Sequence, residues 1–430
     1  MRRLASLLAL SSIIALAACA SDDADRTPSD MPGEVAKSEL ARNLTPDVSN
    51  ENAQALVAGN TAFAVDAYRE LQAGNEGENL FISPHSISNA LAMVYAGARG
   101  NTESQMADAL HFNLPQDQLH PAFNWLDLQL ASRGEGASGS DGGDFRLNVL
   151  NATFGQAGYE FLGDFLDRLA VNYGAGLSLL DFQSDPEGSR EVINTWVADA
   201  TEDNILDLLP QGMISSDTRL VLTNAVYFNA AWKTKFDPDR TAPGTFHAAA
   251  GDVTADMMTG ELQGVLSASG DGYQALTLPY EGDELDMVFI VPDEGEFANI
   301  DTSISPTWLD GVLSSLAPSN IGGVTMPKFD FRFKTSLIDT FKSLGMTDAF
   351  DGNADFSGID GTRSLIITGI VHEAFVKVTE AGTEAGGATA VVVGETSVPE
   401  WVTIDRPFLF LVRDIETGAV LFIGRVLNPS

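Results

Sequence analysis

The stretch Glu380-Ala-Gly-Thr-Glu-Ala-Gly-Gly-Ala-Thr-Ala-Val-Val-Val-Gly-Glu-Thr-Ser397 decides how the chain is interpreted. Its glycines each disfavour a helix by about 1 kcal/mol relative to Ala, and its side chains are too small to bury much apolar area. It lies between two strongly apolar, strand-like runs, 365–379 and 401–413. A slim segment with Thr and Val suits insertion between two strands. A flexible Gly/Ala loop has the same composition, and composition alone favours the loop.

The composition describes a large globular protein with an acidic surface. The 430 residues are 44% hydrophobic and 20% charged, which is enough to bury a sizeable core. The formal net charge of −36 argues against a nucleic-acid partner or an anionic membrane surface, because both require clustered Lys and Arg. Such a charge is compatible with an acidic periplasmic or extracellular protein, or with one adapted to salt.

The N-terminus indicates export. Arg2 and Arg3 precede an apolar run over 4–18 that is too short to span a bilayer. Cys19, the only cysteine, follows at the spacing of a bacterial lipoprotein signal, where it would be acylated. The alternative is an ordinary secretory signal with an incidental cysteine. We expect a signal peptide over 1–18, a disordered tether over 19–50 and one folded domain over 51–430. The location would be a bacterial cell envelope, lipid-anchored at the outer membrane or cell surface, or secreted.

The periodicity predicts an α+β fold. Helical spacing of apolar residues dominates the first half, and Ser83-Pro84 has the form of a helix start. Strand patterns dominate the second half, including a long apolar run over 219–228 and strict alternation at Phe329, Phe331 and Phe333. No βαβ rhythm separates the two kinds of element. The Gly- and Ser-rich stretch 134–144 indicates a mobile loop.

The sequence carries no convincing catalytic constellation. None of the five histidines has the spacing of a zinc site, and no nucleophile elbow or phosphate-binding loop occurs. Asp351-Gly-Asn-Ala-Asp355 lacks the glycine and the bidentate Glu of a calcium loop, so a surface turn is favoured. We therefore expect no enzyme, no metal and no cofactor.

Residues 371–385 and 405–414 closely resemble the two C-terminal signatures of the serpins, the loop-insertion protease inhibitors. Blocks at 79–88, 222–236, 324–329 and 343–346 follow in the family's order, so the similarity covers about 51–430. The resemblance implies helices around three β-sheets with an exposed reactive-centre loop. It implies a monomer that serine proteases attack at this loop. The acyl-enzyme is trapped covalently when the cut loop inserts into the large sheet.

The resemblance also implies roles for residues of the loop. The hinge corresponds to Glu380, Gly382, Thr383, Glu384, Ala385, Gly386, Gly387, Ala388, Thr389 and Ala390. By strand alternation Thr383, Ala385, Gly387 and Thr389 would face the core and Glu384 the solvent. The family's loop length places the cut between Thr396 and Ser397, which suits elastase-like or subtilisin-like proteases. A one-residue offset would place Glu395 before the bond and imply a Glu-specific protease.

A second set of residues matches the family's polar cluster beneath the opening sheet: Ser83, Ser86, Asn224 and His372. Trp232 matches the point where the loop first enters, with ordinary core packing as the alternative. No basic stripe appears, so we expect no activation by heparin-like polyanions. A non-inhibitory serpin that acts as a carrier or chaperone is the alternative function. A hydrolase is disfavoured because the chain lacks a nucleophile–base pair.

Overall fold

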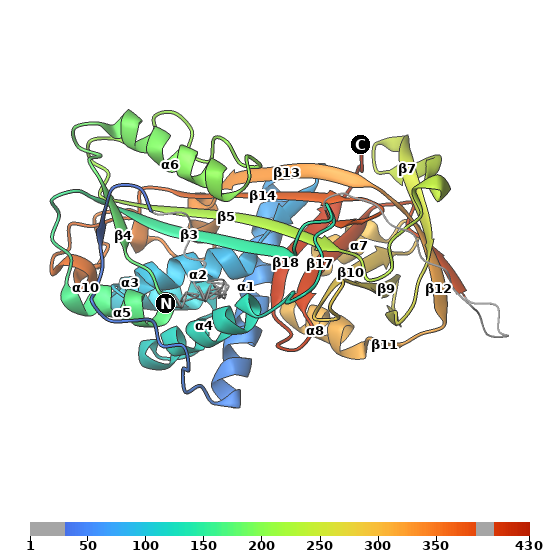
Figure 1. Cartoon of the computed structure of the whole chain (residues 1–430), viewed down its shortest axis with the longest axis horizontal. Helices are drawn as coiled ribbons and strands as arrows, with labels where there is room; N and C mark the ends of the chain where they lie inside the picture. Colours follow the sequence, from blue (N-terminus) through green and yellow to red (C-terminus); the bar gives the residue numbers. More distant parts are fainter. Residues whose placement is uncertain (1–30, 384–399) are drawn as a thin grey trace, which may run out of the picture.

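Three β-sheets are surrounded by helices in the computed structural model, which describes residues 31–383 and 400–430 (Figure 1). The expected α+β class with three sheets is confirmed. Cys19, the hinge positions from Glu384 to Ala390, and the expected cleavage residues Glu395, Thr396 and Ser397 lie outside the described residues.

The helices cluster in the first half of the chain, as the apolar spacing predicts. The α2 helix begins where the sequence places it, because the Ser83 side chain accepts a hydrogen bond from the Ser86 N–H and Pro84 occupies the first turn. The bounds are α1 Asn50–Gly74, α2 Pro84–Tyr95, α3 Gly100–Leu110, α4 Gln116–Ala131, α5 Gly163–Tyr173, α6 Pro186–Ala200, α7 Phe297–Ser303, α8 Pro306–Ser315, α9 Ile338–Ser343 and α10 Ser357–Asp360.

The first sheet has seven strands in the order β1-β4-β3-β5-β15-β14-β13 and is here called the main sheet. Its strands are β1 Glu34–Ala36, β3 Arg146–Gln156, β4 Leu177–Leu180, β5 Leu220–Ala231, β13 Phe329–Ser336, β14 Ile370–Val378 and β15 Gly382–Thr383. All twelve residues of β5 are buried, which agrees with the predicted central strand.

Two further sheets complete the fold. The second, in the order β11-β8-β9-β10-β17-β18-β2, contains β2 Leu80–Ile82, β8 Leu266–Gly270, β9 Tyr273–Pro279, β10 Leu285–Pro292, β11 Ala317–Pro318, β17 Phe408–Asp414 and β18 Val420–Val426. The third, in the order β16-β12-β7-β6, contains β6 Ala242–Ala248, β7 Gly251–Glu261, β12 Ile321–Pro327 and β16 Glu400–Thr403. β15 and β16 thus flank residues 384–399.

The main sheet is covered on one face and partly covered on the other. α6 lies across one face, where Trp196 packs with Phe154 and Val221 in a separate apolar cluster (Figure 1). α2 lies against the other face, and the second sheet extends the same core. On the α6 face the β13 residues Asp330, Arg332 and Lys334 are exposed and Lys377 of β14 is partly exposed. A new strand between β5 and β14 would therefore be buried on the α2 face and partly open on the other.

Residues 31–49 correct the expectation of a disordered tether over 19–50. β1 pairs antiparallel with β4 and so becomes the edge of the main sheet. Arg42 Nε donates to Asn124 Oδ1 (2.8 Å), and the Asn43 N–H donates to the Val171 carbonyl (2.9 Å). The reason is that backbone pairing can satisfy an otherwise open edge strand without an apolar side-chain pattern.

The stretch 134–144 corrects a second expectation, because it is fixed to the main sheet rather than mobile. The Ala231 N–H donates to the Ser138 carbonyl (3.0 Å), and the Phe145 N–H donates to the Ala137 carbonyl (3.1 Å). Ser140 is fully buried. Gly and Ser residues are typical of loops, but here their small size allows the backbone to lie against β5.

Candidate functional site

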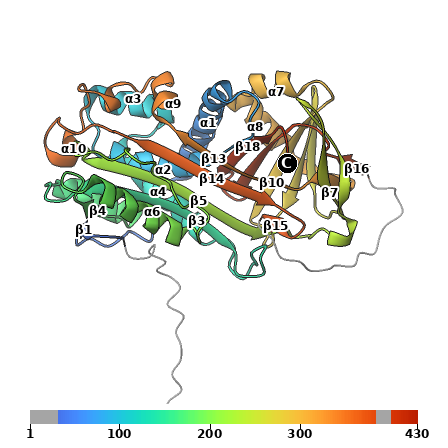
Figure 2. The same ribbon diagram turned by 90° about the horizontal axis from the view of Figure 1, so that it is seen from above.

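The candidate site is the line along which β5 and β14 meet. The two strands pair in parallel at five positions, from Leu222–Ile370 to Val226–Ala374. Farther along, β15 lies between them: Thr383 pairs with Val378 of β14 and with Ala230 of β5 (Figure 2). Residues 227–229 and 375–377 separate the two paired regions, and no pair joins them across the two strands. The main sheet is therefore closed at one end and entered by a third strand at the other.

Gly382 is the first residue of this entering strand, and only glycine fits there. Its φ is +152°, and a Cβ would lie 2.2 Å from the Ala230 carbonyl oxygen and 2.7 Å from the Ala231 Cα. Because the nearest atoms belong to the backbone of β5, they cannot rotate away. Any side chain at 382 would push the hinge away from β5.

Thr383 is buried, with 2% of its surface exposed. Its hydroxyl lies 2.8 Å from the Tyr280 hydroxyl, and its carbonyl accepts a hydrogen bond from Ser140 Oγ (2.6 Å). Burial raises the pKa of Tyr280, so its hydroxyl stays protonated. The Thr383 side chain faces the core, on the side that strand alternation assigns to it.

Trp232 lies where the chain enters the main sheet. Its ring stacks on Tyr280, with centroids 4.7 Å apart and planes 11° apart. Its Nε1–H donates to the Thr379 carbonyl (3.0 Å), and its backbone N–H donates to the Ala381 carbonyl (2.9 Å). Trp232 therefore contacts the hinge through hydrogen bonds in addition to its core packing.

Glu380 is held by two other side chains just before the entering strand. Its carboxylate accepts from Thr241 Oγ1 (2.7 Å) and lies 2.9 Å from Lys328 Nζ. Burial by itself would raise the pKa of Glu380, but the hydrogen bonds from Thr241 and Lys328 outweigh burial and lower it. The Phe236 N–H also donates to the Glu380 carbonyl (2.8 Å). This residue therefore fixes the chain at the turn into β15.

The polar cluster lies at the closed end, across the β5–β14 seam. His372 Nδ1 is 2.6 Å from Asn224 Oδ1, and the Ser83 N–H donates to His372 Nε2 (3.2 Å). Since Nε2 accepts, Nδ1 must carry the proton. Asn224 Nδ2 donates to Ser86 Oγ and to Asn151 Oδ1 (2.7 Å). The four residues expected from the sequence thus come together, and one hydrogen bond of this cluster joins the two strands directly.

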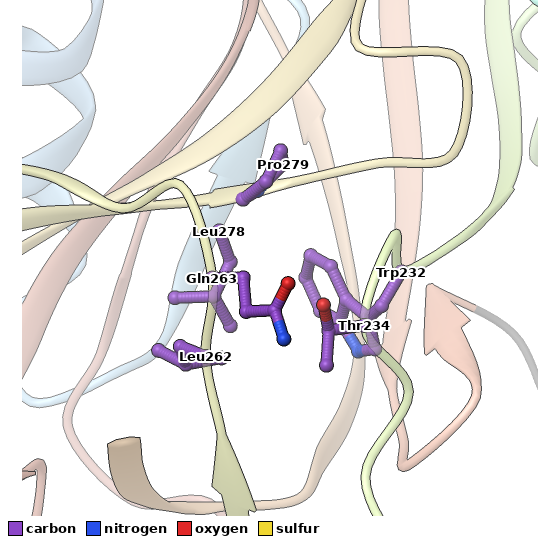
Figure 3. A pocket seen from close by; sticks show the side chains of 6 residues that line it. All are labelled: Trp232, Thr234, Leu262, Gln263, Leu278 and Pro279. Carbon is purple, nitrogen blue, oxygen red and sulfur yellow. The ribbon is translucent and has the colours of Figure 1, made fainter. Parts of the chain in front are cut away.

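A hollow lies beside Trp232, lined by Trp232, Thr234, Leu262, Gln263, Leu278 and Pro279 (Figure 3). Its volume is about 10 Å³, which is about the space that one water molecule needs. A ligand pocket usually has several hundred Å³ and a mostly apolar lining.

Among the described residues, no group of three or more His, Cys, Asp or Glu side chains is placed to hold a metal ion. None of the helices in 31–383 and 400–430 has the length and apolarity needed to cross a bilayer.

Residues 58–429 match the family model described as Serpin (serine protease inhibitor). The chain belongs to the serpin family. This serpin is 38% identical over 376 residues to an uncharacterized serpin-like protein of Thermococcus kodakarensis, covering 86% of this chain and 84% of the relative. It is 36% identical over 385 residues to the leukocyte elastase inhibitor of Homo sapiens, covering 87% and 99%. The crystal structure of uncleaved ovalbumin superimposes with a TM-score of 0.77 at 28% identity, covering 87% of this serpin and all of that chain.

Sequence reasoning missed several residues that hold the hinge of this serpin: Ser140, Tyr280, Thr241 and Lys328. Each is more than 50 positions from its hinge partner, so no local spacing connects them. Ser140 lies in the stretch expected to be mobile. The one available signal was Glu380, an acidic residue beside an apolar strand, which requires a partner when buried.

Acid should destabilise the serpin, because three buried histidines are neutral in the fold. Burial lowers the pKa of His372 to about 3, of His120 to about 3 and of His85 to about 4. An unfolded chain takes up these protons below about pH 6.5. The contribution of these three neutral histidines to the free energy of unfolding is therefore fully present above about pH 6.5. It is lost as the pH falls toward their folded-state pKa values. Each group contributes up to about 1.4 kcal/mol per pH unit in that window.

Urea unfolding at pH 5.0–7.5 measures this dependence. His372→Gln should reduce the slope of stability against pH by about one group's share, because one buried proton acceptor is removed. His247 is exposed and its pKa is raised by a hydrogen bond to Asp252, so His247→Gln should leave the loss of stability on acidification in place. An equal slope in His372→Gln and the unsubstituted serpin would contradict a neutral His372.

Proposed function

We propose that this serpin inhibits serine proteases as a suicide substrate. A protease cuts the loop between β15 and β16 and forms an acyl-enzyme with it. The released hinge then enters the main sheet between β5 and β14 and carries the protease with it. The observation that supports this proposal is the position of Gly382 and Thr383, which are already paired between the two strands. The first two residues of an inserted strand are thus in place before any cut.

Extending the pairing of Thr383 supports the proposed path. An inserted strand in the same antiparallel register would bring Glu384 opposite Asn229 and Lys377. Five residues later Thr389 would lie opposite Asn224 and His372, the two residues that hydrogen-bond across the seam. A Thr hydroxyl can both donate and accept, so Thr389 can replace the hydrogen bond that its entry would break.

The energetic gain also supports insertion. The closed form joins β5 and β14 by five residue pairs. An inserted strand would pair with both neighbours over about a dozen residues. At roughly 1 kcal/mol net per hydrogen bond, the gain is of order 10 kcal/mol. The intact form would therefore be held above its lowest free energy until the loop is cut.

The target class follows from the expected cleavage site. Thr396 before the bond suits elastase-like or subtilisin-like proteases, and Glu395 would instead suit a Glu-specific protease. The name of one relative, leukocyte elastase inhibitor, supports the first assignment. Incubation with each protease class, followed by mass spectrometry of the loop, determines the bond. A covalent complex that survives denaturing electrophoresis is the expected product. A cut loop with fully active protease would contradict the proposal.

Cleavage of the loop should raise the thermal stability of the serpin. A gain of order 10 kcal/mol corresponds to a rise in Tm of roughly 12 °C for a domain of nearly 400 residues. Scanning calorimetry of intact and cleaved protein measures the difference. Equal melting temperatures would indicate a non-inhibitory member, such as a carrier or chaperone, because the cut hinge would then have stayed outside the sheet.

We also propose that Cys19 is acylated and holds the serpin at a bacterial envelope. The fold begins by residue 31, so about a dozen residues would separate the lipid from the domain, a reach of at most about 40 Å. Detergent phase partitioning tests this location. The full-length chain should enter the detergent phase, and Cys19→Ser should remain in the aqueous phase. Equal partitioning of the two would contradict acylation.

A further inference from the structure

Residues 134–144 form a loop, here called the entry loop, that lies against the point where the hinge enters the main sheet. The base of this loop is fixed by Arg146, which pairs with Asp141 and places its guanidinium 5.7 Å from the Tyr227 ring centroid. Its middle is fixed to β5 by the hydrogen bond from the Ala231 N–H to the Ser138 carbonyl (3.0 Å). The entry loop therefore presents Ser140 to the hinge from a defined position.

Ser140 connects β5 to the hinge through a single side chain. Its backbone N–H donates to Asn229 Oδ1 (2.7 Å). Its hydroxyl has two acceptors in reach, Asn229 Oδ1 at 2.9 Å and the Thr383 carbonyl at 2.6 Å. A hydroxyl has only one proton to donate. Because Asn229 Oδ1 already receives the Ser140 N–H, the hydroxyl proton is best used by the closer Thr383 carbonyl.

The Ser140 hydroxyl adds a side-chain hydrogen bond to the Thr383 carbonyl, beyond the strand pairing of Thr383 with Ala230. Thr383 and Ser140 are both buried, with 2% and 0% of their surfaces exposed. Loss of the Ser140 hydrogen bond therefore weakens the attachment of this buried carbonyl to the main sheet, while the strand pairing with Ala230 remains. The alternative for Thr383 is to leave the sheet and meet water. Removal of the Ser140 hydroxyl should therefore shift the hinge outward.

We propose that Ser140 is a positioning residue for loop insertion, which keeps Gly382 and Thr383 seated in the main sheet before the loop is cut. This role rests on the proposed inhibitory function. A seated strand end gives insertion a fixed starting point and register. When the hydrogen bond from Ser140 to Thr383 is lost, the cut loop begins insertion later, and more acyl-enzyme is hydrolysed before the protease is trapped. Ser140 would thus tune the partition between inhibition and simple substrate cleavage.

Hydrogen exchange of the intact serpin tests whether Ser140 holds Gly382 and Thr383 in the main sheet, and it requires no protease. In Ser140→Ala the amides of Gly382 and Thr383 should exchange about fivefold faster, the usual effect of one hydrogen bond. Ser138→Ala is the matched control, because Ser138 lies in the same entry loop and holds it to β5 through its backbone carbonyl, which the substitution keeps. Unchanged exchange in Ser140→Ala, or an equal change in both variants, would overturn the proposal.

Titration of a trapped protease tests the consequence. Ser140→Ala should raise the stoichiometry of inhibition about fivefold, while the rate of initial loop cleavage stays the same. A merely structural role for Ser140 would lower the melting temperature without separating these two quantities. Asn229→Leu, which removes the acceptor that orients Ser140, should act in the same direction and serves if Ser140→Ala folds poorly. An unchanged stoichiometry in a folded variant would overturn the role in trapping.

The two measurements separate this inference from the proposed function. Faster exchange in Ser140→Ala, combined with no covalent complex in the unsubstituted serpin, would reject the inhibitory function. It would still support the role of Ser140 in holding Gly382 and Thr383 in the main sheet. A covalent complex whose yield does not depend on Ser140 would keep the function and reject the positioning role.

Discussion

Replacement of Thr383 by Arg should turn the serpin from an inhibitor into a substrate. The Thr383 side chain is 2% exposed, and its hydroxyl lies 2.8 Å from the Tyr280 hydroxyl. A guanidinium at this place would be buried without a counter-charge, at a cost of several kcal/mol. Since each 1.4 kcal/mol is a factor of ten, the trapped fraction should fall at least about a hundredfold. The loop itself should still be cut at the usual rate, because the cut precedes insertion.

The matched control is Glu384→Arg, one residue farther along the chain. An inserted strand in the register of Thr383 would turn this side chain to the opposite face of the sheet, where Lys377 is partly exposed, so Glu384→Arg should still form the covalent complex in high yield. Denaturing electrophoresis after incubation with protease measures both variants. Full inhibition by Thr383→Arg would contradict the register on which the proposed insertion depends.

Replacement of Glu380 by Lys should destabilise the intact serpin and promote self-association. The change removes the hydrogen bond from Thr241 and sets a second positive charge beside Lys328. The pair is only partly buried, so we expect a loss of about 2–3 kcal/mol, less than for a fully buried pair. The hinge would then leave the sheet, and the facing edges of β5 and β14 would be open to a strand from another molecule. Urea unfolding and size-exclusion chromatography measure the two effects.

A charge swap separates the ion pair from other causes. Glu380→Lys combined with Lys328→Glu should recover part of the lost stability, because the opposite charges meet again. Glu294→Lys alters the net charge equally at an exposed position and should change stability by less than about 0.5 kcal/mol. If the double variant loses as much stability as the two single variants lose together, the Glu380–Lys328 ion pair contributes nothing to the free energy of unfolding.

Much of the fold could be predicted from the sequence, because its local patterns agree with the tertiary structure. The Ser83-Pro84 cap, the apolar run of β5 and the alternating Phe residues of β13 are readable without knowing their neighbours. The family resemblance placed Ser83, Ser86, Asn224 and His372 in one cluster, and the structure brings them together. Alternation also predicted that Thr383 faces the core.

The contacts that hold the hinge could not be predicted, because they join distant parts of the chain. Ser140 and Thr383 are separated by 243 positions, and nothing in a Gly- and Ser-rich stretch indicates such a partner. The order of segment 31–49 could not be predicted either, because its polar composition is typical of disordered segments. β1 is nevertheless ordered by backbone pairing with β4, and backbone pairing is invisible in side-chain composition.

In the proposed insertion, the gap between the two paired regions of β5 and β14 would set the order in which residues of the cut loop meet existing strand pairs. In the register of Thr383, the next three residues would advance through a stretch where no bond between the strands must break. Gly387 would be the first to compete with an existing pair, Val226–Ala374. The first three residues of the inserting segment would therefore add strand pairs without breaking any. The first broken pair would fall at Gly387, which has no side chain to pass between the parting strands.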